Sequence, residues 1–224
     1  MNGAKKSGPA AGKLLPAPPK KQDRAIATRR SLTEAARRIF ARDGFENARV
    51  EDIAAAAGKT RGAFYANFRD KEDVFFAIFE EYLSRDKEQV TFRLRETSCS
   101  AERIDALARH LASIIRDRPR MLLALEFKQY AIRHPRKHKR LADLHATLCA
   151  RCMETDLDKL LPEFAAASAE EKRSQSSQIG AILEGLALNC MFDEGSLSED
   201  QVVRQIRVNL GLVLAQEHAD AGRC

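Results

Sequence analysis

Apolar side chains recur at intervals of three and four residues along most of the chain after residue 22. This spacing is typical of amphipathic helices that pack one face on a core. No alternating stretch is long enough to predict a strand. The stripes predict nine helices, over residues 23–43, 50–57, 60–67, 71–94, 104–115, 121–132, 141–161, 179–190 and 202–214. The sequence therefore predicts an all-α fold.

Residues 48–71 contain two of the shortest predicted helices, one directly after the other. The stripe over residues 50–57 predicts a two-turn helix that Gly58 ends, and Thr60 is expected to cap a second helix that runs through Asn67. Two helices joined by a tight turn with a glycine are typical of a helix-turn-helix, whose second helix enters the major groove of DNA. Because isolated helices this short are marginal, they must dock on the preceding long helix.

Charge is unevenly divided along the chain. Residues 1–71 contain 16 Lys or Arg against 7 Asp or Glu, a net +9, so within the total of +6 the remaining residues carry −3. A basic third beside a slightly acidic body indicates a polyanionic partner at one end only. Residues 1–21, rich in Pro and Lys, are expected to form a disordered basic tail that either lies along DNA or only aids solubility.

Several short runs in the first third of the chain follow one another in a specific order. They are Phe40-Ala41-Arg42-Asp43-Gly44-Phe45, Val50-Glu51-Asp52-Ile53-Ala54, Ala57-Gly58, Arg61-Gly62-Ala63-Phe64-Tyr65, Phe68 and Lys71-Glu72. This combination resembles the amino-terminal DNA-binding domain of the TetR (tetracycline-repressor) family of bacterial regulators, over residues 23–75. The resemblance implies a three-helix helix-turn-helix domain at 22–70 and a six-helix ligand-binding and dimerisation domain at 71–224.

Two positions depart from the family pattern. Ala48-Arg49-Val50 stands where the family usually opens the second helix with Ser or Thr, and loss of such a cap costs about 1 kcal/mol. Arg49 is a candidate substitute, as a phosphate ligand. Lys59 follows Gly58 where an apolar residue is usual, which adds charge near the DNA.

The second short helix carries the candidate DNA-reading side chains. Arg61 and Asn67 can hydrogen-bond base edges with two atoms, whereas the hydroxyls of Thr60 and Tyr65 usually bond phosphates. The resemblance implies that Lys71, at the start of the fourth helix, contacts a phosphate. The predicted DNA contacts are Arg49, Lys59, Thr60, Arg61, Ala63, Tyr65, Asn67 and Lys71.

The resemblance also implies roles for the rest of the chain. The last two helices, over Ile179–Cys190 and Val202–Leu214, are expected to form a homodimer, although their apolar faces can equally pack within one chain. A cavity for an unknown small-molecule effector is expected among the middle helices. Its candidate residues are Phe79, Tyr82, Phe92, Met121, Phe127, Tyr130, Met153, Asn189 and Met191, with Glu126 and Gln129 as polar anchors.

One set of residues supports an alternative to an apolar effector. His138, His145, Cys149 and Cys152 are spaced so that they share one helix face. Imidazole and thiolate bind borderline and soft metals, and Cys-x-x-Cys pairs can be redox-active. One straight helix rarely supplies four ligands to a metal, so we expect no metal site, and a redox- or metal-responsive regulator is the second hypothesis.

The function predicted first is a sequence-specific transcriptional regulator, a repressor that leaves a palindromic operator on duplex DNA when the effector binds. An enzyme is not expected, because the sequence has no Gly-rich phosphate loop, nucleophile elbow or metal-hydrolase motif, and no cofactor is predicted. There is no apolar run of about 18 residues and no signal-peptide pattern, and the five Cys are irregularly spaced. We therefore expect a cytoplasmic protein that does not enter a membrane.

Overall fold

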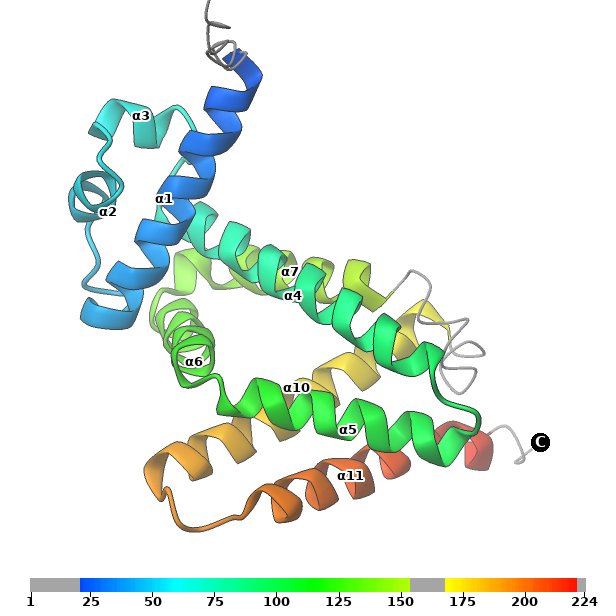
Figure 1. The fold of residues 1–224 in the computed structure, drawn as a ribbon. Coiled ribbons are helices and arrows are strands. Elements are labelled where there is room, and N and C mark those ends of the chain that lie inside the picture. Colours follow the sequence, from blue (N-terminus) through cyan, green and yellow to red (C-terminus); the bar gives the residue numbers. More distant parts are fainter. Residues whose placement is uncertain (1–20, 154–167, 221–224) are drawn as a thin grey trace, which may run out of the picture.

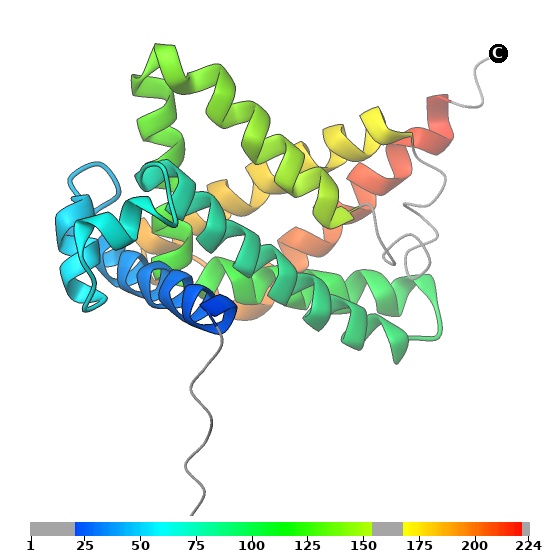
Figure 2. The same cartoon turned by 90° about the horizontal axis from the view of Figure 1, so that it is seen from above.

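The computed structural model describes residues 21–153 and 168–220. The described residues form helices and contain no strand, which confirms the all-α prediction; the predicted tail lies outside them, apart from Lys21. The helices are α1 Lys21–Asp43, α2 Val50–Ala56, α3 Arg61–Tyr65, α4 Lys71–Arg95, α5 Ser100–Arg116, α6 Arg118–Arg133, α7 Pro135–Met153, α10 Ala169–Phe192 and α11 Glu199–Asp220. Both views place α1–α3 together at one end, with α4 running away from them into the body (Figures 1 and 2).

The turns around α2 follow the glycines. Gly44 and Gly58 have φ angles of 77° and 64°, a region that glycine enters without steric cost, and each directly follows the last turn of a helix. At the start of α2, Arg49 makes no side-chain capping bond within the described residues. Thr60 does cap α3, since its Oγ1 accepts a hydrogen bond from the Ala63 backbone N–H at 3.1 Å.

Phe45 holds the three-helix domain on the body. Its side chain is fully buried, and its ring packs edge-on against Phe75 of α4 and against Phe127 and Tyr130 of α6. The same apolar cluster includes Leu141 of α7. The core of the end that carries α1–α3 is therefore continuous with helices beyond residue 70, while the domain boundary at 70/71 stays a prediction.

A second apolar cluster builds the body from α4, α5, α6, α10 and α11. α11 packs on α5 through buried side chains such as Ile206 and Leu210. Four large apolar side chains on these last two helices remain exposed instead: Leu188, Phe192, Val208 and Leu212. α10 and α11 thus bury one face within the chain and leave apolar groups on another.

Several predicted helix ends differ from the structure, and the largest difference is at α10, which begins at Ala169 and not at residue 179. α7 begins at Pro135 and not at residue 141, because proline is compatible with the first turn of a helix; its predicted end at 161 lies outside the described residues. α6 begins three residues early, at Arg118, where Asp117 caps it. α5 begins at Ser100, directly after Cys99, and not at residue 104. α3 ends at Tyr65, so Asn67 lies in the turn that follows.

Candidate nucleic-acid interface and ligand cavity

The start of α3 presents polar side chains to solvent. Thr60, Arg61 and Tyr65 are exposed, whereas Phe64 between them is fully buried and anchors the helix. The Arg61 guanidinium lies 3.1 Å from a Glu51 carboxylate oxygen and 5.6 Å from the centre of the Tyr65 ring. Both partners of this ion pair are more than half exposed, so the contact is weak and a phosphate or a base can replace it.

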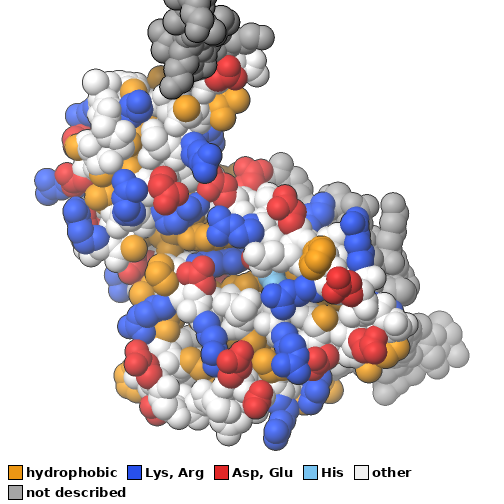
Figure 3. Space-filling model, viewed as in Figure 1, with side chains coloured by type: hydrophobic (Ala, Val, Ile, Leu, Met, Phe, Trp, Pro, Cys, Tyr) orange, Lys and Arg blue, Asp and Glu red, His pale blue; other side chains and the backbone are white. Residues whose placement is uncertain are grey.

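The flanking cations are also open to solvent. Arg49 before α2 and Lys59 in the turn are both exposed, and Ala63 is half-buried on α3. In Figure 3, Lys and Arg side chains are frequent around α1–α3, with Asp and Glu between them, and both signs of charge also occur over α5 and α11. The exposed cations Arg49 and Lys59 lie at the end of the molecule that carries α3.

Asn67 and Lys71 differ from the other predicted DNA contacts, because their side-chain nitrogen atoms donate hydrogen bonds to backbone carbonyls. The Asn67 side-chain amide donates to the Ala63 carbonyl at 2.8 Å, and its own backbone carbonyl accepts from Arg29 at 2.8 Å. The Lys71 ammonium donates to the carbonyls of Phe45 and Glu46, at 2.9 and 2.5 Å. Burial lowers the pKa of Lys71, against the opposing charge of Glu72. Both side chains brace the domain from within.

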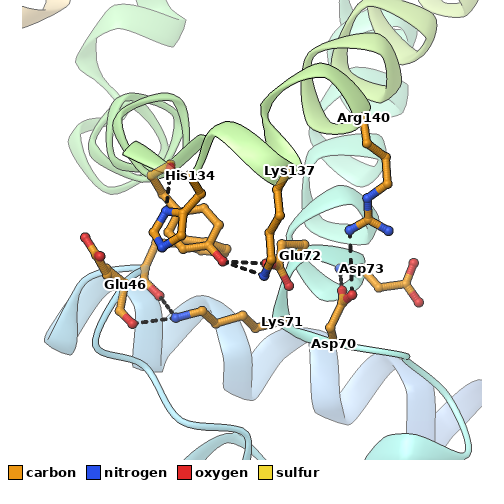
Figure 4. A network of polar contacts seen from close by, with 10 residues as sticks. Glu46, Asp70, Lys71, Glu72, Asp73, His134, Lys137 and Arg140 are labelled. Atoms are coloured by element: carbon orange, nitrogen blue, oxygen red, sulfur yellow. Dashed lines mark hydrogen bonds and ion pairs between the residues drawn. The ribbon is translucent and has the colours of Figure 1, made fainter. Parts of the chain in front are cut away.

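A network of polar groups joins the start of α4 to α6 and α7 (Figure 4). The Glu72 carboxylate is buried and accepts hydrogen bonds from the Tyr130 hydroxyl at 2.6 Å and from the Lys137 ammonium at 2.5 Å. The ammonium also donates to the Tyr130 oxygen at 2.8 Å. Burial alone would raise the pKa of Glu72, but the bonds from Lys137 and Tyr130 outweigh it and lower that pKa. The same contact raises the pKa of Lys137.

Glu126 adds a second link between the ends of the molecule. Its carboxylate accepts the Phe45 backbone N–H at 2.7 Å, directly beside Gly44. Glu126 and Tyr130 were predicted as cavity residues, and in the structure both contact Phe45, at the end of the molecule that carries α1–α3. Helical spacing in the sequence does not show which neighbour a polar side chain faces.

A cavity of about 500 Å³ lies among α4, α5, α6, α7 and α10. Its wall is mainly apolar, with Phe75, Ile78, Phe79, Leu107, Leu111 and Leu183 among the lining residues. A volume of this size and an apolar wall are typical of small-molecule sites. Three of the predicted residues line it: Phe79, Tyr82 and Met121.

The other predicted cavity residues whose side chains are described do not line the cavity. The side chain of Met153 lies outside the described part of the structure. Phe127 is buried in the apolar cluster around Phe45. Phe92, Gln129 and Asn189 are exposed, and Met191 packs on the second apolar cluster. Sequence periodicity placed these residues on plausible helices, but the crossing angles of the helices decide which face reaches the cavity.

The polar residues of the cavity wall were missed in the sequence. Asp86, His110 and Arg120 line it, and the Arg120 guanidinium hydrogen-bonds both carboxylate oxygens of Asp86. Lys128, also on α6, donates to Glu184 of α10 at 2.5 Å. These partners are 34 and 56 residues apart in sequence, so no local pattern reveals them.

The metal or redox set is only partly brought together. His145 and Cys149 both line the cavity, with Nδ1 and Sγ 3.9 Å apart, and the His145 ring stacks on Phe79. Burial, together with the charge of Lys128, lowers the pKa of His145 to about 4. His138 is exposed, and the side chain of Cys152 is not among those described. No group of three potential metal ligands occurs in the described residues.

Comparison with known proteins agrees with the geometry at α1–α4. Residues 32–78 match the family model of bacterial regulatory proteins, tetR family. Over these residues the chain is similar to that family. It is 41% identical over 69 residues to the HTH-type transcriptional repressor AcnR of Corynebacterium efficiens, which is 31% of this chain and 37% of that protein. It is 34% identical over 95 residues to the HTH-type transcriptional repressor Rv1474c of Mycobacterium tuberculosis, 40% of this chain and 51% of that protein.

The chain thus spans between about a third and a half of the length of these curated relatives.

Solved structures extend the likeness to the fold of the body. A putative TetR-family regulator from Mesorhizobium loti aligns with a TM-score of 0.59 and 22% identity, over 86% of this chain and 97% of that one. FadR from Bacillus subtilis, in complex with stearoyl-CoA, aligns with a TM-score of 0.54 and 16% identity, over 83% and 97%. Both curated relatives are named as transcriptional repressors. None of the described helices has the length and apolar character needed to span a membrane.

Proposed function

We propose that this protein is a transcriptional repressor that binds a palindromic operator as a homodimer and leaves it when a small molecule occupies the cavity. The observation that carries the proposal is the exposed start of α3, held on a buried core by Phe64. A short helix with one face fixed and the other polar and exposed is the geometry that enters a major groove. The repressor names of the curated relatives support the direction of regulation.

The proposed contacts to DNA fall into two kinds. Arg61 reads a base edge, because its guanidinium is exposed and its salt bridge to Glu51 is exchangeable. Thr60, Tyr65, Lys59 and Arg49 position the domain on phosphates, which fixes register without reading sequence. Ala63 lies on the same helix and permits close approach to the bases. Asn67 and Lys71, whose nitrogens have internal partners, brace this surface.

The proposed dimer uses α10 and α11. Leu188, Phe192, Val208 and Leu212 are more than half exposed, and Phe192 reaches 92%. Exposed apolar side chains on two helices that contact each other are typical of a protein–protein interface, and a two-fold axis there would pair the same helices of both protomers. Two protomers related in this way present two α3 helices, which is why the operator is proposed to be palindromic.

Effector control is proposed to run through α4. This helix lines the cavity with Phe79, Tyr82 and Asp86, and at its other end it holds Lys71 and Glu72 in the network that binds α6 and α7. A ligand that favours a different position of α4 would shift both α3 helices of the dimer and weaken operator binding by its differential affinity for the two states. The apolar wall favours a largely apolar ligand.

The proposal is tested by selecting bound sequences from random duplex DNA with the full chain and with Arg61→Ala. We expect a palindromic consensus, and we expect Arg61→Ala to relax base preference at one position of each half-site. Glu51→Ala is the matched control, since it removes the partner of Arg61 and leaves the guanidinium. Selection of no consensus by the unaltered chain would refute sequence-specific binding.

A further inference from the structure

The imidazole of His110 is buried and lacks a hydrogen-bond partner among the described residues. Its side chain is 1% exposed, it lines the cavity from α5, and neither ring nitrogen has a hydrogen-bond partner among the described residues. A carboxylate oxygen of Asp86 lies 3.8 Å from Nε2, which is beyond hydrogen-bond distance. Buried polar groups are nearly always paired, so an unpaired imidazole in a cavity wall indicates a bond that a ligand completes.

Ser176 repeats this situation on a second helix. Its hydroxyl oxygen is buried and lacks a hydrogen-bond partner within the described structure, and the residue lines the same cavity from α10. α5 and α10 pack against each other, so the two groups belong to one wall of neighbouring helices. A hydroxyl can donate and accept. A neutral imidazole has one nitrogen for each role, so the two side chains can bond the same kinds of ligand group.

The charges inside the cavity are already compensated. Arg120 is bonded to Asp86 and Lys128 to Glu184. Burial lowers the pKa of His110 despite Asp86, and it lowers the pKa of His145 as well, so both rings are neutral near pH 7. The remaining charged residues of the wall both contact solvent: Lys87 is half-buried and Arg173 is exposed. An anion drawn deep into this cavity would lose its hydration without meeting a free positive charge.

We propose that the cavity binds an uncharged, largely apolar small molecule whose hydroxyl or carbonyl group hydrogen-bonds His110, with Ser176 as a second polar contact. This proposal rests on the effector control proposed above and names the chemical class of the effector. His110 and Ser176 select for one polar group, and the apolar wall takes up the rest of the ligand. A charged head group at the solvent-facing cations is the competing arrangement that the test must exclude.

The test is equilibrium dialysis of the full chain against matched probes: 1-naphthol, naphthalene and 1-naphthoate, with 1-decanol and decanoate as an aliphatic pair. We expect each alcohol to bind at least about tenfold more tightly than its carboxylate, because burying the charge is not compensated. His110→Phe keeps a ring and removes both nitrogens, so it should weaken 1-naphthol about 5- to 20-fold and leave naphthalene within about twofold. Ser176→Ala should weaken 1-naphthol about two- to fivefold.

Ser174→Ala is the matched control, since Ser174 is exposed on the same helix and does not line the cavity, and it should leave all affinities unchanged. His110→Gln, which restores an amide donor and acceptor, should recover part of the lost affinity if the Phe variant folds poorly. Tighter binding of the carboxylates, or equal 1-naphthol affinity in His110→Phe, would overturn the proposal, as would binding of none of the probes. Operator affinity measured on the same preparations separates the outcomes: a chain that binds DNA but none of the alcohols refutes only the ligand class.

Discussion

The starts of α3 and α4 lie ten residues apart and are built in opposite ways. At the start of α3, Thr60 and Arg61 are exposed, and the ion pair of Arg61 is open to solvent. At the start of α4, the Lys71 ammonium is bound by two carbonyls, and Glu72 is buried with two side-chain partners. An exposed group can exchange its partner for DNA at little cost, whereas a buried bonded group is costly to release. The first arrangement suits recognition, and the second suits transmission of movement.

The largest expected difference between the two helix starts is in stability. Glu72→Ala removes the shared acceptor of Tyr130 and Lys137, and we expect the free energy of unfolding to fall by about 2–3 kcal/mol in urea denaturation. The loss is below that of a fully buried ion pair, because the Lys137 side chain is 45% exposed and can regain water. Glu51→Ala, at the exposed end of the Arg61 pair, should change stability by less than about 0.5 kcal/mol. Equal losses would contradict the contrast.

The next effect concerns pH and the cavity end of α4, where His145 stacks on Phe79. The pKa of His145 is lowered to about 4 in the folded protein, so between its ordinary value of 6.5 and 4 the unfolded chain binds a proton that the folded chain does not. Stability should therefore fall as pH drops through this window, by about 1–3 kcal/mol in total, and His145 should add no further loss below pH 4.

This contribution is isolated by comparing denaturation curves of the unaltered chain and His145→Leu from pH 7 to pH 4, because other groups titrate in both proteins. The variant should lose less stability across that range. His138→Ala, an exposed position on the same helix, should follow the unaltered chain. An identical pH dependence in His145→Leu and the unaltered chain would show that the imidazole is not kept neutral by burial.

A third effect should appear in DNA affinity and leave stability nearly untouched. Tyr65→Ala removes a half-exposed ring and hydroxyl from α3, and we expect operator affinity to fall about three- to tenfold, measured by fluorescence anisotropy. Stability should change by less than about 0.5 kcal/mol, because the Phe64 anchor remains. Phe64→Ala provides the contrast, with a loss of about 3 kcal/mol or more in stability. Unchanged affinity in Tyr65→Ala would remove this residue from the interface.

The smallest and most specific effect separates the two lysines. Lys59→Ala should reduce the slope of log affinity against log salt by about 1, since an exposed phosphate contact releases counterions. Lys71→Ala should weaken operator binding with little change in that slope, because its ammonium holds the Phe45 and Glu46 carbonyls. A reduced slope for Lys71→Ala would instead support the phosphate contact that the sequence resemblance implies.

The fold of the end that carries α1–α3 was predictable because its determinants are local. Gly44 and Gly58 end helices through backbone conformations that glycine favours, Thr60 caps α3 through the Ala63 N–H, and Phe64 and Phe68 are buried as the helical spacing requires. The cavity was predicted less well. Glu126 and Tyr130 face the DNA-binding end, and His110, Asp86 and Arg120 were not recognised.

The sequence by itself determined which segments are helical, where they turn and which short helix carries exposed polar groups, because periodicity, capping and glycine act within a few residues of the chain. Only the tertiary structure decided how these helices cross. The crossings pair Glu72 with Lys137, 65 residues apart in sequence, and Asp86 with Arg120, 34 residues apart. They also leave His110 in the cavity wall without a hydrogen-bond partner among the described residues. Such contacts depend on the relative orientation of whole helices, which no local pattern in the sequence encodes.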